Sequence, residues 1–485
     1  MAASSMRRRF ADRSGKGDSP TANTRTPSPS RKSIGTKETT HSTSGGWPAK
    51  RSRHHQCEGE PGVMSERRKA GAEVTHPTSG NSALSNEVAQ EPAHVRAAAA
   101  HPNPYPFYSR LVAGAPIYRE GPTGPWIAVS AAAVNAVLTS PLCLTRPAGN
   151  PVPEPMAGTP VAEIFSRLVR MNDGEIHCPL KSTVASALEG LSDRRVADLT
   201  KNLATDLAAT IGPEMDDERL TRFIYTLPAE VIMSLLGIPA VSFAEVAGWM
   251  GDYGTAAASA VTGVPPVSSD IMSAGAESSA MLLRLFRDLF EAPSDDDGSL
   301  FGALARQAAR SGKPDAEMVI ANGIGLMAQG FAGTAALIGS TLVALARHPD
   351  VLAAVRGDRT LLGQAVHEVL RHDPITHSTL RFVDKGGIVA GQPMLAGDMI
   401  IVTLAAASRD PALNPDPDRF DIFRENRKYL EFGTGVHACP SVQLATTIAE
   451  VALNHLLERG VGLNGLEKRV SYRPSAHVRM PVFNA

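Results

Sequence analysis

A short segment near the C-terminus constrains the fold of this chain more than any other feature. Residues 432–445 read FGTGVHACPSVQLA, which places Cys439 in a glycine-punctuated loop directly before an amphipathic stretch. The free N–H groups and the positive dipole end of a helix start stabilise a thiolate, and a thiolate is a good axial donor to heme iron. Glycine lets the backbone approach a flat ligand closely. On these residues alone, a buried and inert cysteine is the alternative.

Three other short motifs precede that segment. Glu368 and Arg371 stand at i and i+3 near the end of a predicted helix, so they share a face and can pair. The sequence PDRF, which contains Arg419, follows further along the chain. His177 and Lys181 are one helical turn apart, and both can donate to an anion. Each motif alone is equally typical of solvated surface residues.

Apolar residues with helical spacing dominate the rest of the chain. They predict helices at residues 194–210, 217–236, 279–290, 316–345, 360–371 and 441–459. Short apolar runs between turn residues predict strands at 117–118, 126–129, 380–383, 387–389 and 399–404. We therefore expect a mostly helical domain with a minor sheet, and the helix at 316–345 is long enough to cross its whole body.

Taken in their order along the chain, the four motifs resemble those of the cytochrome P450 superfamily, and the resemblance covers about residues 104–482. The cysteine segment is similar to the family's FGxGxHxCxGxxLA loop and departs from it at Ser441, where the family usually has Gly. The resemblance implies the cytochrome P450 fold, a single large domain with a long central helix over the cofactor. It also implies heme b as that cofactor, with Cys439 as the axial ligand of the iron.

The resemblance assigns roles to residues of the other motifs as well. Glu368, Arg371 and Arg419 would form a buried triad that locks the heme loop, which is a structural role. His177, Lys181, Arg381 and His437 would contact the heme propionates. Lys181 stands where the family has Arg in HxxxR, which keeps the charge but loses the two-pronged guanidinium contact.

The long helix departs from the family where protons are usually delivered. The family carries an acid followed by an alcohol there, and in this chain Ala332 and Gly333 fall at those two positions. Thr334 follows one residue later, about 100° further around the helix. Its hydroxyl should therefore point away from the iron unless the helix unwinds locally near Gly330 and Gly333.

Three enzymatic interpretations follow from the resemblance and this departure. The first is a monooxygenase that oxidises a small apolar molecule of secondary metabolism, with electrons from a ferredoxin or flavodoxin and its reductase. The second is a non-oxygenating enzyme that isomerises, dehydrates or couples its substrate. The third is a peroxide-driven peroxygenase, and a heme-binding protein without turnover is a further alternative. Catalytic candidates on the long helix are Ala332, Gly333 and Thr334.

The regions that would line the substrate pocket are rich in small apolar residues, which predicts an apolar pocket. Gly330, Thr376 and His377 are the candidates for contact with substrate, and loop hydrogen bonding is the alternative for the two polar ones. The basic group Arg424, Arg427 and Lys428 could receive an acidic redox partner, and a solvated turn is its alternative.

The N-terminal stretch differs in composition from everything after it. Residues 1–95 are rich in Ser, Thr, Pro, Gly and Arg, and they lack the apolar h-region of a signal peptide. We predict a disordered extension, either a targeting or regulatory tail or, as we favour, an over-extended gene start with Met64 as the true one. The heme domain is then residues 96–485.

Charge and cysteine content exclude several classes of partner. The chain has 48 Lys and Arg against 49 Asp and Glu, which gives no reason to expect nucleic acid as a partner. Its four cysteines are scattered, so neither a disulfide framework nor a zinc cluster is expected, and a reducing, cytoplasmic location is the default. We expect no membrane span, and we expect a monomer.

Overall fold

The computed structural model describes residues 91–212, 214–291, 298–312 and 315–484. The chain divides into two units, Met1–Gln56 and Cys57–Ala485. The first unit, and nearly all of the extension predicted at residues 1–95, lies outside the described residues. From Val95 onward the chain contributes to the core, since Val95 is buried and Ala98 and Ala99 are inaccessible to solvent.

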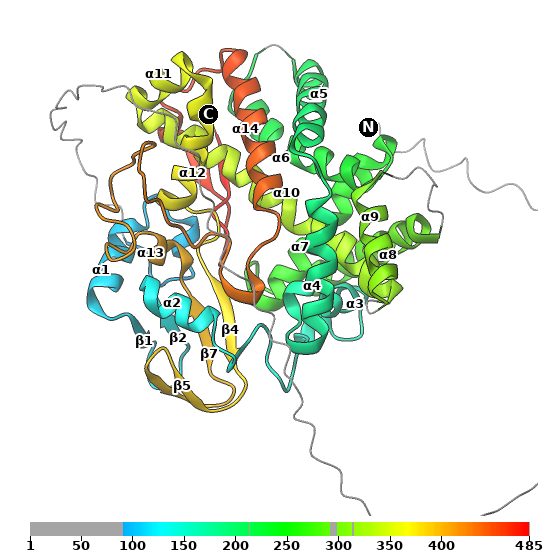
Figure 1. The fold of residues 1–485 in the computed structure, drawn as a ribbon, viewed down its shortest axis with the longest axis vertical. Helices are drawn as coiled ribbons and strands as arrows, with labels where there is room; N and C mark the ends of the chain where they lie inside the picture. The colour runs from blue at the N-terminus through cyan, green and yellow to red at the C-terminus, as the bar shows by residue number, and fades with distance from the viewer. Residues whose placement is uncertain (1–90, 213, 292–297, 313–314, 485) are drawn as a thin grey trace, which may run out of the picture. The chain divides into compact units, whose positions relative to one another are not determined.

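Helices make up most of the described chain (Figure 1). They are α1 (Tyr105–Gly114), α2 (Ala131–Leu138), α3 (Pro160–Arg167), α4 (Gly174–Glu189), α5 (Asp193–Ile211), α6 (Asp217–Leu236), α7 (Phe243–Thr262), α8 (Ser269–Glu291), α9 (Leu300–Ser311), α10 (Ala316–Arg347), α11 (Pro349–Gly357), α12 (Leu362–His372), α13 (Leu404–Ser408) and α14 (Val442–Glu458).

Side-chain caps set where several of these helices begin. Ser192 accepts a hydrogen bond from the backbone N–H of Arg195 at the start of α5, and Asp315 accepts one from Met318 at the start of α10. Each cap satisfies one of the N–H groups that a helix start leaves without a partner. At the far end of α6, Gly237 adopts a left-handed φ of 88°, which ends the helix.

The strands form one small mixed sheet and two hairpin-like pairs. The five-stranded sheet has the order β1 (Ile117–Arg119), β2 (Trp126–Ala128), β7 (Met399–Val402), β4 (Thr379–Val383), β3 (Cys143–Leu144). Strands β2 and β7 are parallel, and the other neighbours are antiparallel. The smaller pairs are β5 (Gly387–Val389) with β6 (Gln392–Met394), and β8 (Val470–Tyr472) with β9 (Pro481–Phe483).

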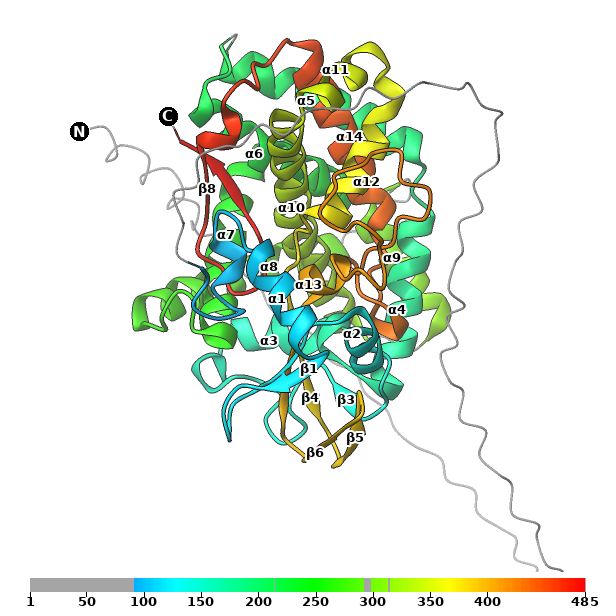
Figure 2. The ribbon, with the colours of Figure 1, turned by 90° about the vertical axis from the view of Figure 1, so that its left-hand side faces the viewer.

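Helix α10 runs through the middle of the helical part and packs against α6, α8, α3 and α14 (Figure 2). Residues 319–325 and 334–345 are all buried, whereas residues 328–333 between them are half-buried or exposed. The central turn of α10 is thus less covered by neighbouring side chains than the turns on either side of it, and we call it the open turn. That turn carries Gly330, Ala332 and Gly333.

By length and composition alone, α10 is the one helix among the described residues that could cross a membrane. The most apolar window of the helix has a mean hydropathy of 1.4, and 61% of it is buried inside the protein. Close packing explains the apolar composition: a Cβ added at Gly323 would lie 2.7–2.8 Å from the rings of Phe301 and Phe286. These properties are typical of a core helix.

Candidate functional site

Cys439 ends a tight loop that leads directly into α14. Its backbone N–H donates to the carbonyl of Phe432 across 2.8 Å, which closes the loop on itself. Gly433 and Gly435 have φ angles of 68° and 71°, in the left-handed region that favours glycine. The two glycines of the motif are therefore required by the path of the backbone. The thiol of Cys439 is free and half-buried.

Helix α4 brings Lys181 to this loop. The ammonium group donates to the carbonyl of Ala438, the residue before Cys439. Burial lowers the pKa of Lys181, and the negative charge of a Cys439 thiolate acts in the opposite direction. Lys181 is therefore close enough to the sulfur for the two charges to interact.

His177 lies on the same face of α4 and stacks near the loop. Its ring centre is 4.1 Å from that of His437. Burial, followed by the charges of His437 and Lys181, lowers the pKa of His177 to about 4. His177 is thus neutral near neutral pH and can act as a hydrogen-bond donor without adding charge.

Asp173, which the sequence motifs did not single out, completes this cluster. Its carboxylate lies 2.9 Å from Nε2 of His437 and accepts from the backbone and side chain of Thr145. Burial acts to raise the pKa of Asp173, but these hydrogen bonds outweigh it and bring the pKa to about 2. The charge of Asp173 also acts on Arg381, a buried residue of β4 whose pKa is lowered by burial.

The residues of this cluster fit a heme. Lys181 and the imidazoles of His177 and His437 lie at the loop that carries the Cys439 thiol, and the charge of Arg381 acts on Asp173 beside them. A heme presents two carboxylates and an iron that accepts a thiolate. Helix α10, with its open central turn, packs against α14, which starts three residues after Cys439. The chain thus offers a ligand and counter-charges in one region, next to a helix that packs against α10.

Glu368 and Arg371 form the buried ion pair that the sequence predicts. Both side chains are fully buried, with Arg371 Nη2 2.6 Å from Glu368 Oε1. Arg419 was predicted to be the third member of this triad, and the structure corrects that prediction. Its side chain is 65% exposed and pairs with Asp421 at 2.8 Å, and only its backbone carbonyl accepts a hydrogen bond from Arg371.

Arg427 supplies the guanidinium that was predicted for Arg419. Its Nε lies 2.8 Å from Glu368 Oε2, while Oε1 already accepts from Arg371 and from the backbone N–H of Asp421. Arg424 adds a weaker contact with the carboxylate at 3.7 Å. Both oxygens of the Glu368 carboxylate therefore have hydrogen-bond partners.

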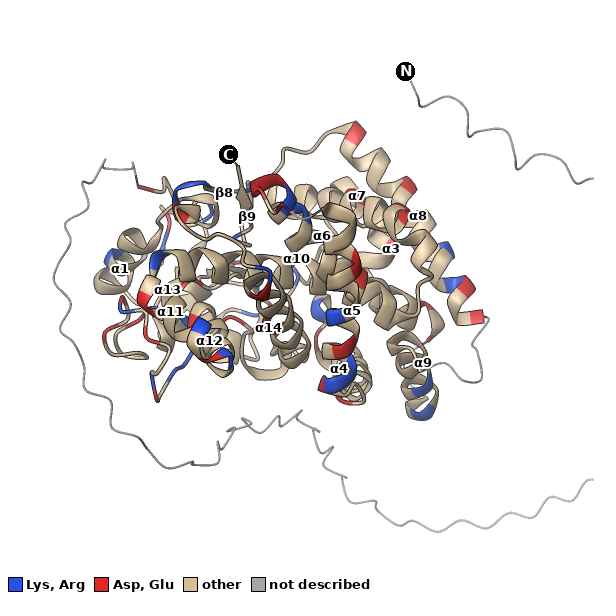
Figure 3. Cartoon of the chain, turned by 90° about the horizontal axis from the view of Figure 1, so that it is seen from above, with Lys and Arg blue, Asp and Glu red and all other residues tan. Residues whose placement is uncertain are grey.

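The same contacts correct the predicted docking group. Side chains of Arg424 and Arg427 are only 12% and 11% exposed, so they hold the interior of the loop together, and Lys428 alone of the three is exposed. On the surface, basic and acidic residues are interspersed over the outer helices α5 and α8 (Figure 3). The sequence of the loop does not reveal that two of its basic residues contact the buried carboxylate of Glu368.

Thr376 and His377, predicted to face substrate, are engaged in the protein interior instead. The backbone N–H and hydroxyl of Thr376 both donate to the carboxylate of Glu431. His377 is inaccessible to solvent, and its Nδ1 lies 2.9 Å from the hydroxyl of Tyr108. Both residues therefore make the loop hydrogen bonds that we weighed against substrate contact. His377 has no exposed surface, whereas Thr376 is half-buried, and its contact with substrate stays a prediction.

On α10, Thr334 is buried and its side chain bonds to its own helix. The helix is continuous over Ala316–Arg347, and the Thr334 hydroxyl donates to the carbonyl of Gly330 across 2.7 Å. A Cβ added at Gly333 would meet no atom within 4 Å, whereas one at Gly330 would lie 2.7 Å from Ile232. A Cβ at Gly333 therefore has room at the open turn, whereas Thr334 is buried.

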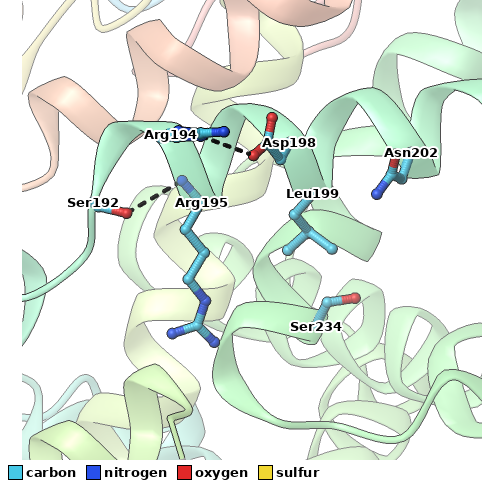
Figure 4. A pocket seen from close by; sticks show the side chains of 7 residues that line it. All are labelled: Ser192, Arg194, Arg195, Asp198, Leu199, Asn202 and Ser234. Atoms are coloured by element: carbon cyan, nitrogen blue, oxygen red, sulfur yellow. Dashed lines mark hydrogen bonds and ion pairs between the residues drawn. The ribbon is translucent and has the colours of Figure 1, made fainter.

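Two surface hollows lie beside α5, away from this cluster. The larger has a volume of about 530 Å³ and is lined by Ser192, Arg195, Asn202 and Ser234 among others (Figure 4). The second, of about 400 Å³, lies between α5 and α14 and includes His455. None of the predicted site residues lines either hollow.

Among the described cysteines, Cys143 and Cys439 have free thiols. Cys57 lies outside the described residues.

Comparison with known proteins places this geometry in context. Residues 291–459 match the family model of cytochrome P450. The chain is 32% identical to the cytochrome P450 monooxygenase PikC of Streptomyces venezuelae, over 74% of this chain and 84% of that protein. It is 28% identical to the vitamin D(3) 25-hydroxylase of Pseudonocardia autotrophica, over 78% and 93% of the two chains.

Among solved structures, the fold is similar to that of P450BioI in complex with an acyl carrier protein ligated to hexadec-9Z-enoic acid. The TM-score is 0.66 at 23% identity, and the match covers 79% of this chain and 98% of that one.

Proposed function

The chain belongs to the cytochrome P450 family, and we propose that it is a heme-thiolate monooxygenase in which Cys439 ligates the iron of heme b. The observation that carries the assignment is the placement of Lys181, His177, His437 and Arg381 around the Cys439 loop. A lone cysteine would not specify a cofactor, and the cations and imidazoles near this thiol are what support a heme.

Each residue of the cluster has a distinct task in this proposal. Cys439 holds the iron, and Lys181, Arg381, His177 and His437 orient the two propionates. Heme held by a thiolate activates dioxygen so that one oxygen atom enters an organic substrate. The buried Glu368, Arg371 and Arg427 group acts on the heme only through the shape of the loop that precedes Cys439.

We propose that the substrate is a small, largely apolar molecule, as in secondary metabolism. The open turn of α10 offers Ala328, Phe331, Ala332 and Gly333, which are apolar and only partly covered. The relative named above is, by its name, a hydroxylase of vitamin D(3). Gly330 is a weaker candidate for substrate contact, since Ile232 packs against it.

Proton delivery is where this chain differs from its family. Ala332 and Gly333 carry neither a carboxyl nor a hydroxyl group, and the proton of Thr334 Oγ1 is committed to the carbonyl of Gly330. We infer that water or a polar group of the substrate carries the protons. The same feature favours the second candidate function, a non-oxygenating enzyme that isomerises, dehydrates or couples a bound substrate, because such chemistry needs no relay. A peroxygenase would not need it either.

Electrons would come from a separate partner, a ferredoxin or flavodoxin with its reductase. The three basic residues that we predicted to receive it do not support a docking surface, because two of them are inside the protein. The choice between partners therefore rests on assay rather than on this loop.

Spectroscopy of the purified holoprotein tests the assignment. Reduced protein with carbon monoxide should show the red-shifted Soret band of a thiolate adduct, and Cys439→Ser should lose either the heme or that band. An unchanged spectrum in Cys439→Ser would refute the ligand. Omitting NAD(P)H and the reductase should abolish product formation; product formed without them and without peroxide would instead support the non-oxygenating enzyme.

A further inference from the structure

Ser441 makes a contact that the family motif does not provide. Its hydroxyl oxygen lies 3.2 Å from the sulfur of Cys439, within hydrogen-bond distance for a sulfur atom. The family usually has Gly at this position, which has no side chain to offer. The sulfur expected to bind iron therefore has a hydroxyl neighbour in this chain.

The hydroxyl could have capped the helix but does not. Ser441 occupies the N-cap position of α14, where serine is among the favoured residues, and yet it makes no side-chain bond to the N–H groups of the first turn. Ser192 and Ser299 make that bond at the starts of α5 and α9. At Ser441 the hydroxyl is turned to the sulfur instead.

The backbone at this position accepts a side chain without strain. Ser441 has a φ of −103° and a ψ of 23°, which any L-residue can adopt. Gly433 and Gly435 of the same loop have left-handed φ angles and need glycine. Serine can thus replace glycine at residue 441, whereas a side chain at either of the other two would distort the loop.

The direction of the hydrogen bond follows from the chemistry of the ligand. A cysteine that binds iron is a thiolate and has no proton, so the hydroxyl of Ser441 must be the donor. We propose, on the basis of the function proposed above, that Ser441 is a positioning residue that hydrogen-bonds the Cys439 thiolate and raises the reduction potential of the bound heme.

The physical reason is the effect of a donor on the electron density of the sulfur. A hydrogen bond to a ligating sulfur withdraws density from it, and such outer contacts tune the potential of a metal site. One-electron reduction adds density to the iron and its ligand, so the bond is stronger in the ferrous state and stabilises that state more. No proton moves, and the electron comes from the redox partner.

Three variants of the holoprotein test this role. Ser441→Ala removes the hydroxyl, Ser441→Thr keeps it, and Gln443→Ala changes an exposed residue on the same turn of α14. For each, the midpoint potential is measured by redox titration and the iron–sulfur stretching frequency by resonance Raman spectroscopy. Both readouts report the ligand directly, and a purely structural role for Ser441 would move neither.

In Ser441→Ala, the ratio of reduced to oxidised heme at a fixed potential should fall about tenfold, which is about 59 mV for a one-electron couple. Its iron–sulfur stretch should rise in frequency, while Ser441→Thr and Gln443→Ala should match the unmodified protein. Unchanged values in Ser441→Ala, or a shift in Ser441→Thr as large as in Ser441→Ala, would overturn the role of the hydroxyl. If the unmodified protein lacked the thiolate band with carbon monoxide, both this proposal and the heme-thiolate assignment would fall.

Discussion

Arg427 donates to the buried carboxylate of Glu368 across 2.8 Å, although the two residues are 59 positions apart in the chain. This contact fastens the loop that leads to Cys439 onto α12. We predict that Arg427→Ala destabilises the protein by roughly 3–5 kcal/mol, because it leaves a fully buried carboxylate short of a partner. Chemical unfolding of the holoprotein, followed by heme absorbance and circular dichroism, measures the loss.

Arg419→Ala is the matched control for that variant. The Arg419 side chain is 65% exposed, so its removal should change the free energy of unfolding by less than about 0.5 kcal/mol. A large loss in Arg419→Ala with a small one in Arg427→Ala would restore the triad as the family motif assigns it.

The triad also marks the limit of what the sequence could predict. The motif spacing correctly predicted that Glu368 and Arg371 pair, since residues at i and i+3 of a helix share a face. It could not predict whether Arg419, Arg424 or Arg427 completes the group, because all three follow within one loop. Only the loop's path decides which guanidinium turns inward.

The helices were likewise predicted well where local apolar spacing is clear, and features that depend on distant residues were not. The predicted helix at residues 217–236 coincides with α6, and the central helix was placed to within two residues. Helix α8 begins at Ser269, ten residues before the predicted start, because its first turns are rich in Ser, Gly and Ala and show little apolar spacing. The resemblance to the family assigns Thr376 and His377 to the pocket. Their hydrogen-bond partners, Glu431 and Tyr108, are distant in the chain and cannot be read from the sequence.

Glu431 should make stability depend on pH. Burial raises its pKa to about 7, against hydrogen bonds from Thr376 that lower it. Below pH 4.5 this carboxyl is protonated in both the folded and the unfolded protein, so it costs no stability. As pH rises from the unfolded-state pKa near 4.5 to the folded-state pKa, the free energy of unfolding falls, because only the unfolded protein loses the proton readily. Glu431→Gln should therefore match the unmodified protein near about pH 4.5 and exceed it by up to roughly 3 kcal/mol above about pH 8.

Thermal or urea unfolding of both proteins across that pH range measures the difference. Glu425→Gln, an exposed position in the same loop, controls for the loss of a charge. A stability difference between Glu431→Gln and the unmodified protein that did not change with pH would contradict the prediction.

The distal helix offers a pair of variants with opposite expectations. A Cβ at Gly333 would meet no atom within 4 Å, so Gly333→Thr should fold and place a hydroxyl at the open turn. We predict that it changes the ratio of product formed to NAD(P)H consumed. Thr334→Ala should change that ratio little, because its hydroxyl bonds only to Gly330 of the same helix. A collapse of activity in Thr334→Ala would mean that the helix unwinds during turnover.

Truncation of the N-terminus tests where the folded domain begins. Arg479 is fully buried, and its guanidinium donates to the carbonyls of Ala99, His101 and Pro102. A chain that starts at Met64 keeps these contacts and should match the full chain in heme content and in melting temperature. A chain that starts at Pro104 leaves the guanidinium with unmet donors, at a cost of roughly 1–3 kcal/mol for each lost bond to this charged group. Equal melting temperatures for all three chains would show that residues 91–103 contribute nothing to stability, and a loss in the Met64 chain would show that the extension is part of the fold.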